Sequence, residues 1–345
     1  MSNERFDESA ALDELESVAE PGGLSRRGLI VKGGLAAAGL TVLGSPAAAY
    51  AARAATTKVK VAVVTHGDTG SFWSVFKKGV DQAASDLKAR GVSVTQAYAN
   101  NDVTKQVAAI NAAIASKVNV IATSVPDASA LKDPLAKAAS RGIEIITVNS
   151  GLGAFDALPT YETHVGQTED IAGQGAGKQF NAAGAKSVVV VIHEASNSGL
   201  TQRAQGVKKT FKGKTSTLLI PNAKSDIPGT QAKIKAYFAA NPKTDALLGL
   251  DPDVTVPAQA VAPKSTKVGT FDVNPAVIKA IEGGKMLFAI DQQQYLQGYL
   301  PVTFAYLFVT NLNTVGNGTP VLTGPGIINK ANAAKVAALA AKGTR

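Results

Sequence analysis

The chain contains no cysteine among its 345 residues, and only 6% of them are aromatic. Without cysteine there can be no disulfide framework, no thiolate metal site, no cysteine nucleophile and no lipid-modified cysteine behind a signal segment. Few aromatics beside abundant alanine, valine and glycine suit helices packed closely on a sheet better than an aromatic-rich sandwich. Apolar residues make up 45% and charged residues 18%, the balance of a folded chain with room for two domains. These features favour an α/β fold.

Motifs that indicate catalysis or metal binding are scarce. The three histidines, His66, His164 and His193, lie too far apart in the sequence for a spaced metal motif. Neither the nucleophile motif G-x-S-x-G nor the phosphate-binding motif G-x-x-x-x-G-K-[ST] occurs. Gly175-Ala176-Gly177 falls inside an expected helix, without the preceding strand that a dinucleotide fingerprint needs. We therefore expect a protein that is not an enzyme, with no cofactor and no metal site.

The first fifty residues have the composition of a targeting segment. An acidic, polar start leads to Ser25-Arg26-Arg27-Gly28-Leu29-Ile30, a weakly apolar stretch over Gly34–Gly44 and then Ala47-Ala48-Ala49. Paired arginines before such a stretch, with small residues at the cut, are typical of a twin-arginine export signal. We expect residues 1–50 to be signal and leader, with cleavage within about 47–55 and a periplasmic or extracellular mature protein. The alternative is a disordered basic tail beside a buried helix.

No long apolar run follows this leader, so we expect no direct membrane insertion after signal cleavage.

Residues 1–50 hold four of the 35 lysines and arginines and seven of the 26 acidic residues, which leaves a formal charge of +12 on the rest. A basic chain can bind nucleic acid. Here the lysines are scattered along amphipathic helices, as in Lys77-Lys78, Lys208-Lys209 and Lys233-Lys235, which favours solvated helix faces. We expect no nucleic-acid partner.

From Lys58 onward, short β-branched runs alternate with segments of helical period, the pattern of repeated βαβ units and parallel sheets. Roughly ten strands fit two lobes better than one sheet. The expected fold is thus α/β, with two Rossmann-like parallel-sheet lobes joined by a multi-crossover hinge. The expected ranges are 58–150 plus 293–315 for the N-terminal lobe and 160–292 plus 325–345 for the C-terminal lobe, with crossings at Ser150–Leu158 and Gly316–Gly326.

In open parallel sheets, ligands bind outside the carboxyl ends of the strands, so polar residues just after each strand are candidate ligands. The candidates combine planar amides, carboxylates, one guanidinium and adjacent aromatics. This combination suits a sugar, whose hydroxyls donate and accept and whose C–H face stacks on a ring. The selected residues are Phe72, Trp73, Asn149, Asn197, Arg203, Asp251, Asp272 and Gln292.

Each candidate also has a structural alternative. At least one of the two aromatics at the start of an amphipathic helix could belong to the core. Asn149 and Asp272 could cap the next turn, and Asp251 could be a helix N-cap. Arg203 could form an exposed salt bridge, and Gln292 could lie in a solvated loop.

Several short stretches of the chain together form a recognisable pattern. They are Ser71-Phe72-Trp73 with Lys78-Gly79, Val120-Ile121 with Pro126-Asp127, Gly142-Ile143 through Val148-Asn149, Val165-Gly166-Gln167 with Ala172-Gly173, Arg203 with Gly206, Leu250-Asp251, and Gly269 through Asp272. Through these stretches the chain, from Lys58 to Ile328, resembles the type I periplasmic sugar-binding proteins of ABC importers, the group of the ribose- and galactose-binding proteins. The resemblance implies that Phe72 and Trp73 sandwich the sugar ring, while the other six candidates hydrogen-bond its hydroxyls or ring oxygen.

Three departures from the family pattern leave the ligand open. Gly70 stands where family members place an Asn or Asp, Ser150 where ribose-type members have an arginine, and Asp251 where Asn is commoner. A pentose, a hexose and an open-chain polyol are comparable candidates. The resemblance implies a membrane ABC permease as partner, a sugar or polyol as ligand, and a monomer.

Two alternatives remain. One is a binding protein for another solute, such as an amino acid, a nucleoside or a signalling furanosyl compound. The other is a secreted carbohydrate-active enzyme, for which Asp251 and Asp253 could supply paired carboxylates.

Overall fold

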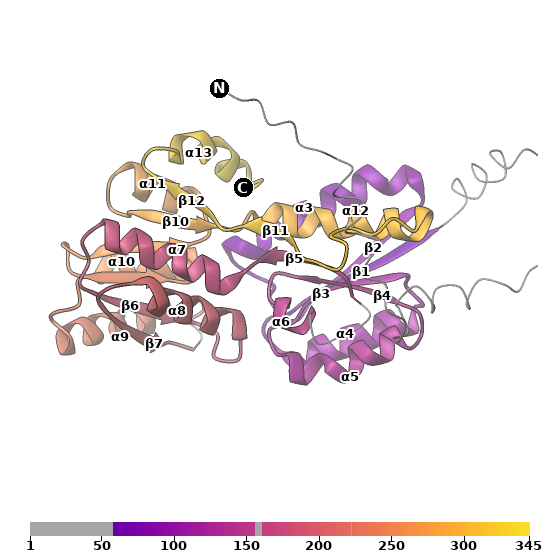
Figure 1. Ribbon diagram of the computed structural model, residues 1–345, viewed down its shortest axis with the longest axis horizontal. Coiled ribbons are helices and arrows are strands. Elements are labelled where there is room, and N and C mark those ends of the chain that lie inside the picture. Colours follow the sequence, from indigo (N-terminus) through magenta and orange to yellow (C-terminus); the bar gives the residue numbers. More distant parts are fainter. Residues whose placement is uncertain (1–57, 156–160, 222) are drawn as a thin grey trace, which may run out of the picture. The chain divides into compact units, whose positions relative to one another are not determined.

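The computed structural model describes residues 58–155, 161–221 and 223–345. The expected leader, the expected cleavage region up to residue 55 and part of the first expected crossing lie outside these residues. The described elements form two six-stranded sheets, each covered by helices on both faces (Figure 1). The predicted α/β class with two parallel-sheet lobes is confirmed.

The first sheet has the strand order β11-β5-β4-β3-β1-β2, and all its neighbours pair in parallel. Apolar residues alternate between its two faces: in β1, Val61 and Val63 pack under α3 and α12, whereas Ala62 and Val64 pack under α4 and α5. A short helix, α6 (Leu152–Phe155), follows β4. The strands are β1 (Val59–Thr65), β2 (Val92–Tyr98), β3 (Val120–Ser124), β4 (Glu144–Val148), β5 (Tyr161–Gln167) and β11 (Val321–Gly324), and the covering helices are α3 (Ser71–Leu87), α4 (Val103–Ala115), α5 (Ala128–Ala139) and α12 (Gln294–Asn311).

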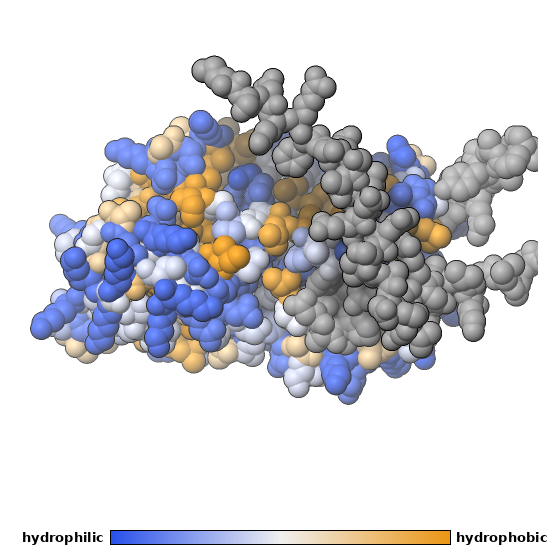
Figure 2. Space-filling model, in the orientation of Figure 1, coloured by the Kyte–Doolittle hydropathy of each residue, from blue (hydrophilic) through white to orange (hydrophobic). Residues whose placement is uncertain are grey.

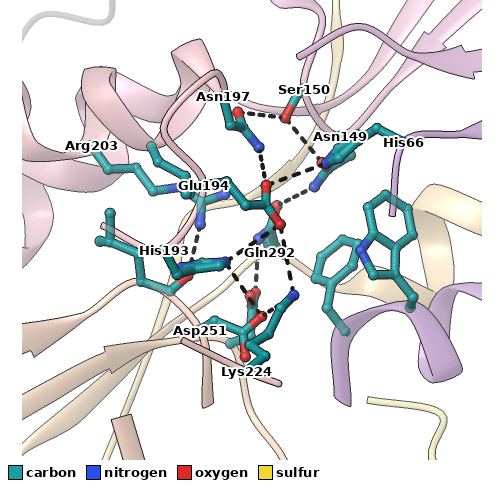
Figure 3. A pocket seen from close by; sticks show the side chains of 15 residues that line it. His66, Asn149, Ser150, His193, Glu194, Asn197, Arg203, Lys224, Asp251 and Gln292 are labelled. Atoms are coloured by element: carbon teal, nitrogen blue, oxygen red, sulfur yellow. Dashed lines mark hydrogen bonds and ion pairs between the residues drawn. The ribbon is translucent and has the colours of Figure 1, made fainter. Parts of the chain in front are cut away.

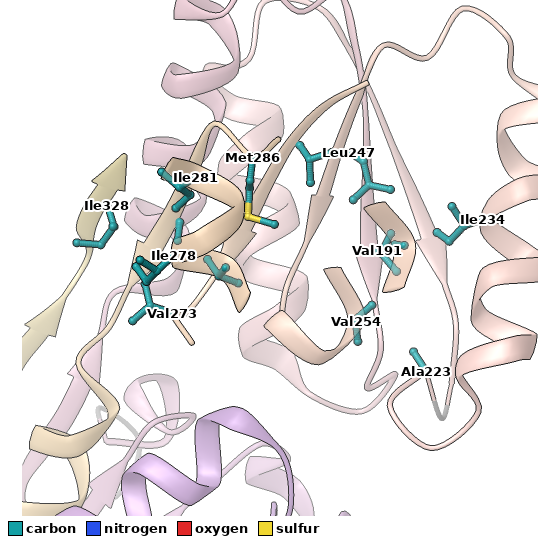
Figure 4. Packing of buried hydrophobic residues seen from close by; sticks show 14 of the residues in the cluster. Val191, Ala223, Ile234, Leu247, Val254, Val273, Ile278, Ile281, Met286 and Ile328 are labelled. Carbon is teal, nitrogen blue, oxygen red and sulfur yellow. The ribbon is translucent and has the colours of Figure 1, made fainter. Parts of the chain in front are cut away.

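The second sheet repeats this plan with the order β12-β10-β9-β8-β6-β7, and only β12 runs antiparallel to its neighbour. Its core lies on both faces; Val191, Leu247 and Ile234 belong to the side shown in Figure 4. The strands are β6 (Ser187–Ile192), β7 (Lys214–Leu219), β8 (Ala246–Gly249), β9 (Lys267–Phe271), β10 (Phe288–Asp291) and β12 (Gly326–Asn329), and the helices are α7 (Glu169–Ala182), α8 (Ser198–Thr210), α9 (Ile227–Ala240), α10 (Pro252–Val261), α11 (Pro275–Glu282) and α13 (Ala333–Lys342).

The crossings between the sheets differ from the expected ones at one point. Strand β5 pairs with β4 and β11, so it belongs to the first sheet, although the expected range 160–292 placed it in the second lobe. The first crossing therefore follows Gln167 and leads into α7; the expected crossing at Ser150–Leu158 is wrong. The chain returns between β10 and α12, and it crosses again between β11 and β12, inside the expected Gly316–Gly326 segment.

In both lobes, one helix pair packs at backbone contact through glycines. A Cβ on Gly79 of α3 would lie 2.1 Å from the Tyr295 carbonyl of α12, and one on Gly298 would lie 2.1 Å from the Phe76 carbonyl. In the second lobe, a Cβ on Gly173 of α7 would lie 2.1 Å from the Arg203 carbonyl of α8. Only glycine permits this approach, which brings α8 and its arginine against the start of α7.

The surface carries many of the charges that the sequence suggested for helix faces. Lys208, Lys209, Lys233 and Lys235 are exposed, and Figure 2 shows hydrophilic residues spread over the face of the second lobe. None of the described helices combines the length and the apolar character that a membrane crossing requires.

Candidate functional site

A pocket lies at the carboxyl ends of both sheets. All eight residues selected from the sequence line it, in the arrangement that Figure 3 shows. The remaining lining residues are His66, Ser150, His193, Glu194, Leu200, Lys224 and Leu250.

Phe72 and Trp73 come from the first turn of α3. Their rings meet edge to face with centroids 4.8 Å apart, and His66 packs on the Trp73 ring at 5.1 Å. Gly67 makes room for this arrangement, because a Cβ there would lie 1.8 Å from the indole nitrogen. Both aromatics are buried in the core of the first lobe and both also line the pocket. Phe72 and Trp73 therefore belong both to the hydrophobic core and to the wall of the pocket.

Asn149 and Asp272 follow β4 and β9 directly, and both adopt the left-handed backbone region, with φ of 56° and 63°. Asx residues tolerate this region better than other non-glycine residues. Their side chains meet at Gln292: Asn149 Nδ2 lies 3.5 Å from Gln292 Oε1, and Gln292 Nε2 donates to Asp272 Oδ1 at 2.8 Å. Asp272 does not cap the next helix, since Asn274 does so. Burial raises the pKa of Asp272 well above its usual value, although Arg203 and Gln292 oppose this shift.

Arg203 is buried rather than exposed. Its Nε and Nη2 donate to the two oxygens of Glu169 at 2.5 and 2.9 Å, and Nη1 lies 3.4 Å from the Leu250 carbonyl. The guanidinium also lies over the Phe271 ring, 4.4 Å from its centroid. Burial opposes the charge on Arg203, but the attraction of Glu169 outweighs it and raises the pKa of Arg203. The exposed salt bridge considered above is therefore wrong, and the guanidinium is held in one orientation.

A cluster of charges occupies the second-lobe side of the pocket. Lys224 Nζ lies 3.3 Å from Asp251 Oδ2 and 3.7 Å from Glu194 Oε1, and His193 Nε2 lies within 3.8 Å of both acids. Asp251 is also the N-cap of α10, because its Oδ1 accepts from the Asp253 amide at 2.7 Å. Burial opposes the charge on Lys224, but Asp251 and Glu194 raise its pKa. Burial also opposes the charge on Glu194, yet its contact with His66, together with His193 and Lys224, holds its pKa well below the usual value.

Polar contacts join the two lobes around the pocket. Ser150 Oγ of the first lobe lies 3.1 Å from Asn197 Oδ1 at the start of α8, and Asn197 Nδ2 donates to Glu194 at 2.8 Å. His66 Nδ1 lies 2.7 Å from Ser124 Oγ, while its Nε2 lies 3.6 Å from Glu194 Oε2 across the pocket. The structure is thus a closed form in which groups from both sheets meet.

Three charged residues in or beside this site, Glu169, Glu194 and Lys224, were not among the candidates from the sequence. Glu194 and Lys224 follow β6 and β7, so the rule of collecting polar residues after each strand could have found them. Glu169, the partner of Arg203, carries no such signal because an acidic residue in the first turn of a helix is ordinary.

Two α/β lobes that close over a polar pocket define a protein that captures a small ligand. A model of the periplasmic binding protein domain matches residues 61–311, and the chain belongs to this family. The family predicted from the sequence is thereby confirmed.

Relatives of known structure and name agree with this assignment. A carbohydrate transporter protein from Acidothermus cellulolyticus, solved with myo-inositol, is 33% identical with a TM-score of 0.79, covering 84% of this chain and all of that one. The xylose/arabinose-binding protein XylF of Sulfolobus acidocaldarius is 25% identical over 268 residues, which are 72% of this chain and 66% of that protein. A xylitol-binding protein of Mycolicibacterium smegmatis is 28% identical over 161 residues, 46% of this chain and 44% of that protein. The chain thus spans less than two thirds of the two curated relatives, and all three relatives are named for transport or binding rather than catalysis.

Proposed function

We propose that this chain is the extracytoplasmic solute-binding protein of an ABC transporter, and that it captures a neutral monosaccharide or polyol between its two lobes. The observation that carries the proposal is the composition of the pocket. Aromatic rings from α3 face amides, carboxylates and a fixed guanidinium from the second lobe. Ring hydroxyls need such donors and acceptors, and a C–H face needs such a ring.

The charges of the pocket favour a neutral ligand. Arg203 is paired with Glu169, and Lys224 lies between Asp251 and Glu194. Both cations thus already have carboxylate partners, so a phosphate or carboxylate on the ligand would meet no uncompensated positive charge. This is evidence against a sugar phosphate, a uronic acid or an amino acid.

Among neutral ligands we place a cyclitol first. The Acidothermus relative, which was solved with myo-inositol, matches 84% of this chain along the whole of its own length. Xylose and xylitol follow, because the two curated relatives are named for them.

Mass spectrometry of small molecules released from freshly purified protein, followed by calorimetry with myo-inositol, D-xylose and xylitol, tests this proposal. We expect one polyol to be released and one of the three compounds to bind at micromolar concentration or tighter. Binding of L-alanine or a nucleoside without any polyol would overturn the proposal in favour of another solute class.

We further propose that residues 1–50 direct export by the twin-arginine route and that the mature protein acts as a monomer beside a membrane permease. Replacing Arg26 and Arg27 by lysine should retain the protein in the cytoplasm, which fractionation of cells would show.

Light scattering of the mature chain should give the mass of one copy; a dimer would contradict the proposal of a monomer.

We also propose a lobe division that follows the sheets. It assigns residues 58–167, 293–315 and 321–324 to the first lobe, and residues 168–292 and 325–345 to the second.

A further inference from the structure

Helix α3, which presents the two pocket aromatics, begins without a cap of its own. Its N-cap position is Gly70, which has no side chain, and its first turn contains no acidic residue. The first amides of a helix need acceptors, and an uncapped end is less stable. Six other described helices, α4, α5, α8, α9, α10 and α11, begin with an Asp or Asn whose side chain accepts from the first turn.

The missing acceptor comes from the other lobe. Asp253, in the first turn of α10, accepts from the Ser71 amide through Oδ2 at 2.7 Å and from Ser71 Oγ through Oδ1 at 2.5 Å. Asn274, the N-cap of α11, donates from Nδ2 to Ser71 Oγ at 2.9 Å. Two helix starts of the second lobe therefore hold one residue of the first.

Gly70 is what allows this contact. A Cβ at residue 70 would lie 2.5 Å from Asp253 Oδ2, and the φ of 95° also disfavours any side chain there. The carboxylate of Asp253 thus occupies the space that a side chain at residue 70 would fill. A carboxylate at this position also lies at the positive end of the helix dipole.

The contact lies beside the ligand pocket without forming part of it. Ser71 precedes Phe72 and Trp73 directly, and Asp251, two residues before Asp253, lines the pocket. A single turn of α10 therefore carries one pocket residue and one residue that holds the aromatic turn of the opposite lobe. The bond to Ser71 exists only while the lobes are together.

We propose that Asp253 is a positioning residue for ligand capture: it caps α3 from the opposite lobe on closure and so holds Phe72 and Trp73 over the bound ligand. This inference rests on the proposed capture of a polyol. Because the cap is made only in the closed form, it slows ligand release more than it speeds ligand entry.

Asp253→Ala tests the proposal, with Asp226→Ala as the matched control. Asp226 also caps a helix of the second lobe, but its carboxylate accepts from Gly229 of its own helix. Trp73 is the only tryptophan of the chain, so its fluorescence reports myo-inositol, D-xylose or xylitol binding directly. We expect Asp253→Ala to raise the dissociation rate about tenfold with little change in the association rate, and Asp226→Ala to leave both unchanged.

A double-mutant cycle separates this contact from a general loss of stability. Ser71→Ala should weaken ligand binding by itself. Asp253→Ala should then reduce the ligand affinity less in the Ser71→Ala background than in the wild type. Wild-type kinetics for Asp253→Ala, or full additivity of the two changes, would overturn the proposal.

A ligand-independent measurement keeps the two proposals apart. Because the chain has no cysteine, the pair Ser71→Cys and Asp253→Cys should form a disulfide on mild oxidation, whereas Ser71→Cys with Asp226→Cys should not. If none of the three compounds binds and no sugar or polyol is released from the purified protein, the proposed function fails, while this crosslink still decides whether the two residues meet. Absence of the crosslink would overturn the positioning role.

Discussion

Arg203 links the stability of the second lobe to its pocket. Its guanidinium is buried against Glu169, so removing it leaves a carboxylate without a partner inside the protein. We expect Arg203→Ala to lower the free energy of unfolding by about 3–5 kcal/mol and to abolish ligand binding. Urea unfolding followed by circular dichroism measures the first effect. Adding Glu169→Gln should restore part of the stability but none of the binding; a fully stable single variant would contradict the buried pair.

Asp272 should behave differently, because its charge is not part of an ion pair of this kind. Its left-handed backbone accepts asparagine, and burial already raises the pKa of its carboxyl group. We expect Asp272→Asn to keep the wild-type unfolding free energy within about 1 kcal/mol while weakening polyol affinity by roughly tenfold or more through the lost acceptor. Asp127→Asn, a cap outside the pocket, is the control in calorimetry. Unchanged affinity for Asp272→Asn would remove Asp272 from the site.

His164 gives the fold a pH dependence unrelated to the ligand. It lies in β5 with Nδ1 2.9 Å from Thr147 Oγ1, and burial lowers its pKa from 6.5 to about 3. Below pH 6.5 the unfolded chain therefore binds a proton that the folded chain does not. Lowering the pH from 7 to 5 should therefore reduce the free energy of unfolding by about 2 kcal/mol through this histidine. In urea unfolding at both pH values, His164→Asn should lose less stability than the wild type; equal losses would contradict the buried neutral imidazole.

The sequence predicted several of the pocket residues that follow strands, because a parallel sheet brings the ends of its strands to one edge. It could not show what each side chain binds. Arg203 next to lysines on a helix has the pattern of an exposed residue, and only the packing of α7 against α8 reveals its partner. Asp251 has both of the roles considered for it, since it caps α10 and also lines the pocket.

At the scale of elements, paired glycines set how closely the helices that carry the site approach each other. We expect Gly298→Ala and Gly206→Ala each to lower the unfolding free energy by more than about 2 kcal/mol, because their Cβ atoms would meet backbone carbonyls at 2.1 Å. Gly175→Ala in α7 is the control, since its Cβ would lie 3.7 Å from Ile327 Cδ1. Thermal unfolding should show this variant as stable as the wild type or more so. Similar losses for all three would contradict the close contacts.

The elements found from sequence periodicity are those whose burial follows a simple pattern. The helix from Phe72 and the strands around Val61 and Val189 have clear apolar faces. Strand β5 has no such face in its sequence, because it buries Thr163, His164 and Gln167, whose polar character hides a central strand. Strands β11 and β12 are four residues each, on either side of Pro325, too short for any periodicity to show.

At the scale of the whole molecule, the three crossings are tied by neutral side chains. Gln297 Nε2 lies 3.1 Å from the backbone oxygen of Gln292 and from Thr323 Oγ1, and Thr323 Oγ1 donates to the Gly166 carbonyl. All three crossings thus meet in one hydrogen-bonded group. Such a hinge allows the lobes to rotate as rigid bodies.

We therefore expect the radius of gyration from small-angle X-ray scattering to fall when a saturating polyol is added to ligand-free protein. The curve of the bound protein should match the closed structure described here. Asp253→Ala should still contract with saturating ligand, because closure itself follows from ligand contacts on both sides. An identical radius with and without a ligand that binds by calorimetry would contradict hinge closure.

The shared strand order of the two sheets has a consequence for the orientation in which a symmetric ligand is bound. Asn149 and Asp272 follow the fourth strand of their sheets, and His66 and His193 follow the first, so the two halves offer related groups from opposite sides. The aromatic pair belongs to one half and the charged cluster to the other, which breaks this pseudo-twofold symmetry. A meso ring has mirror-related halves that are equivalent in solution. In such a pocket they become distinct, and an achiral molecule is held in one chiral orientation.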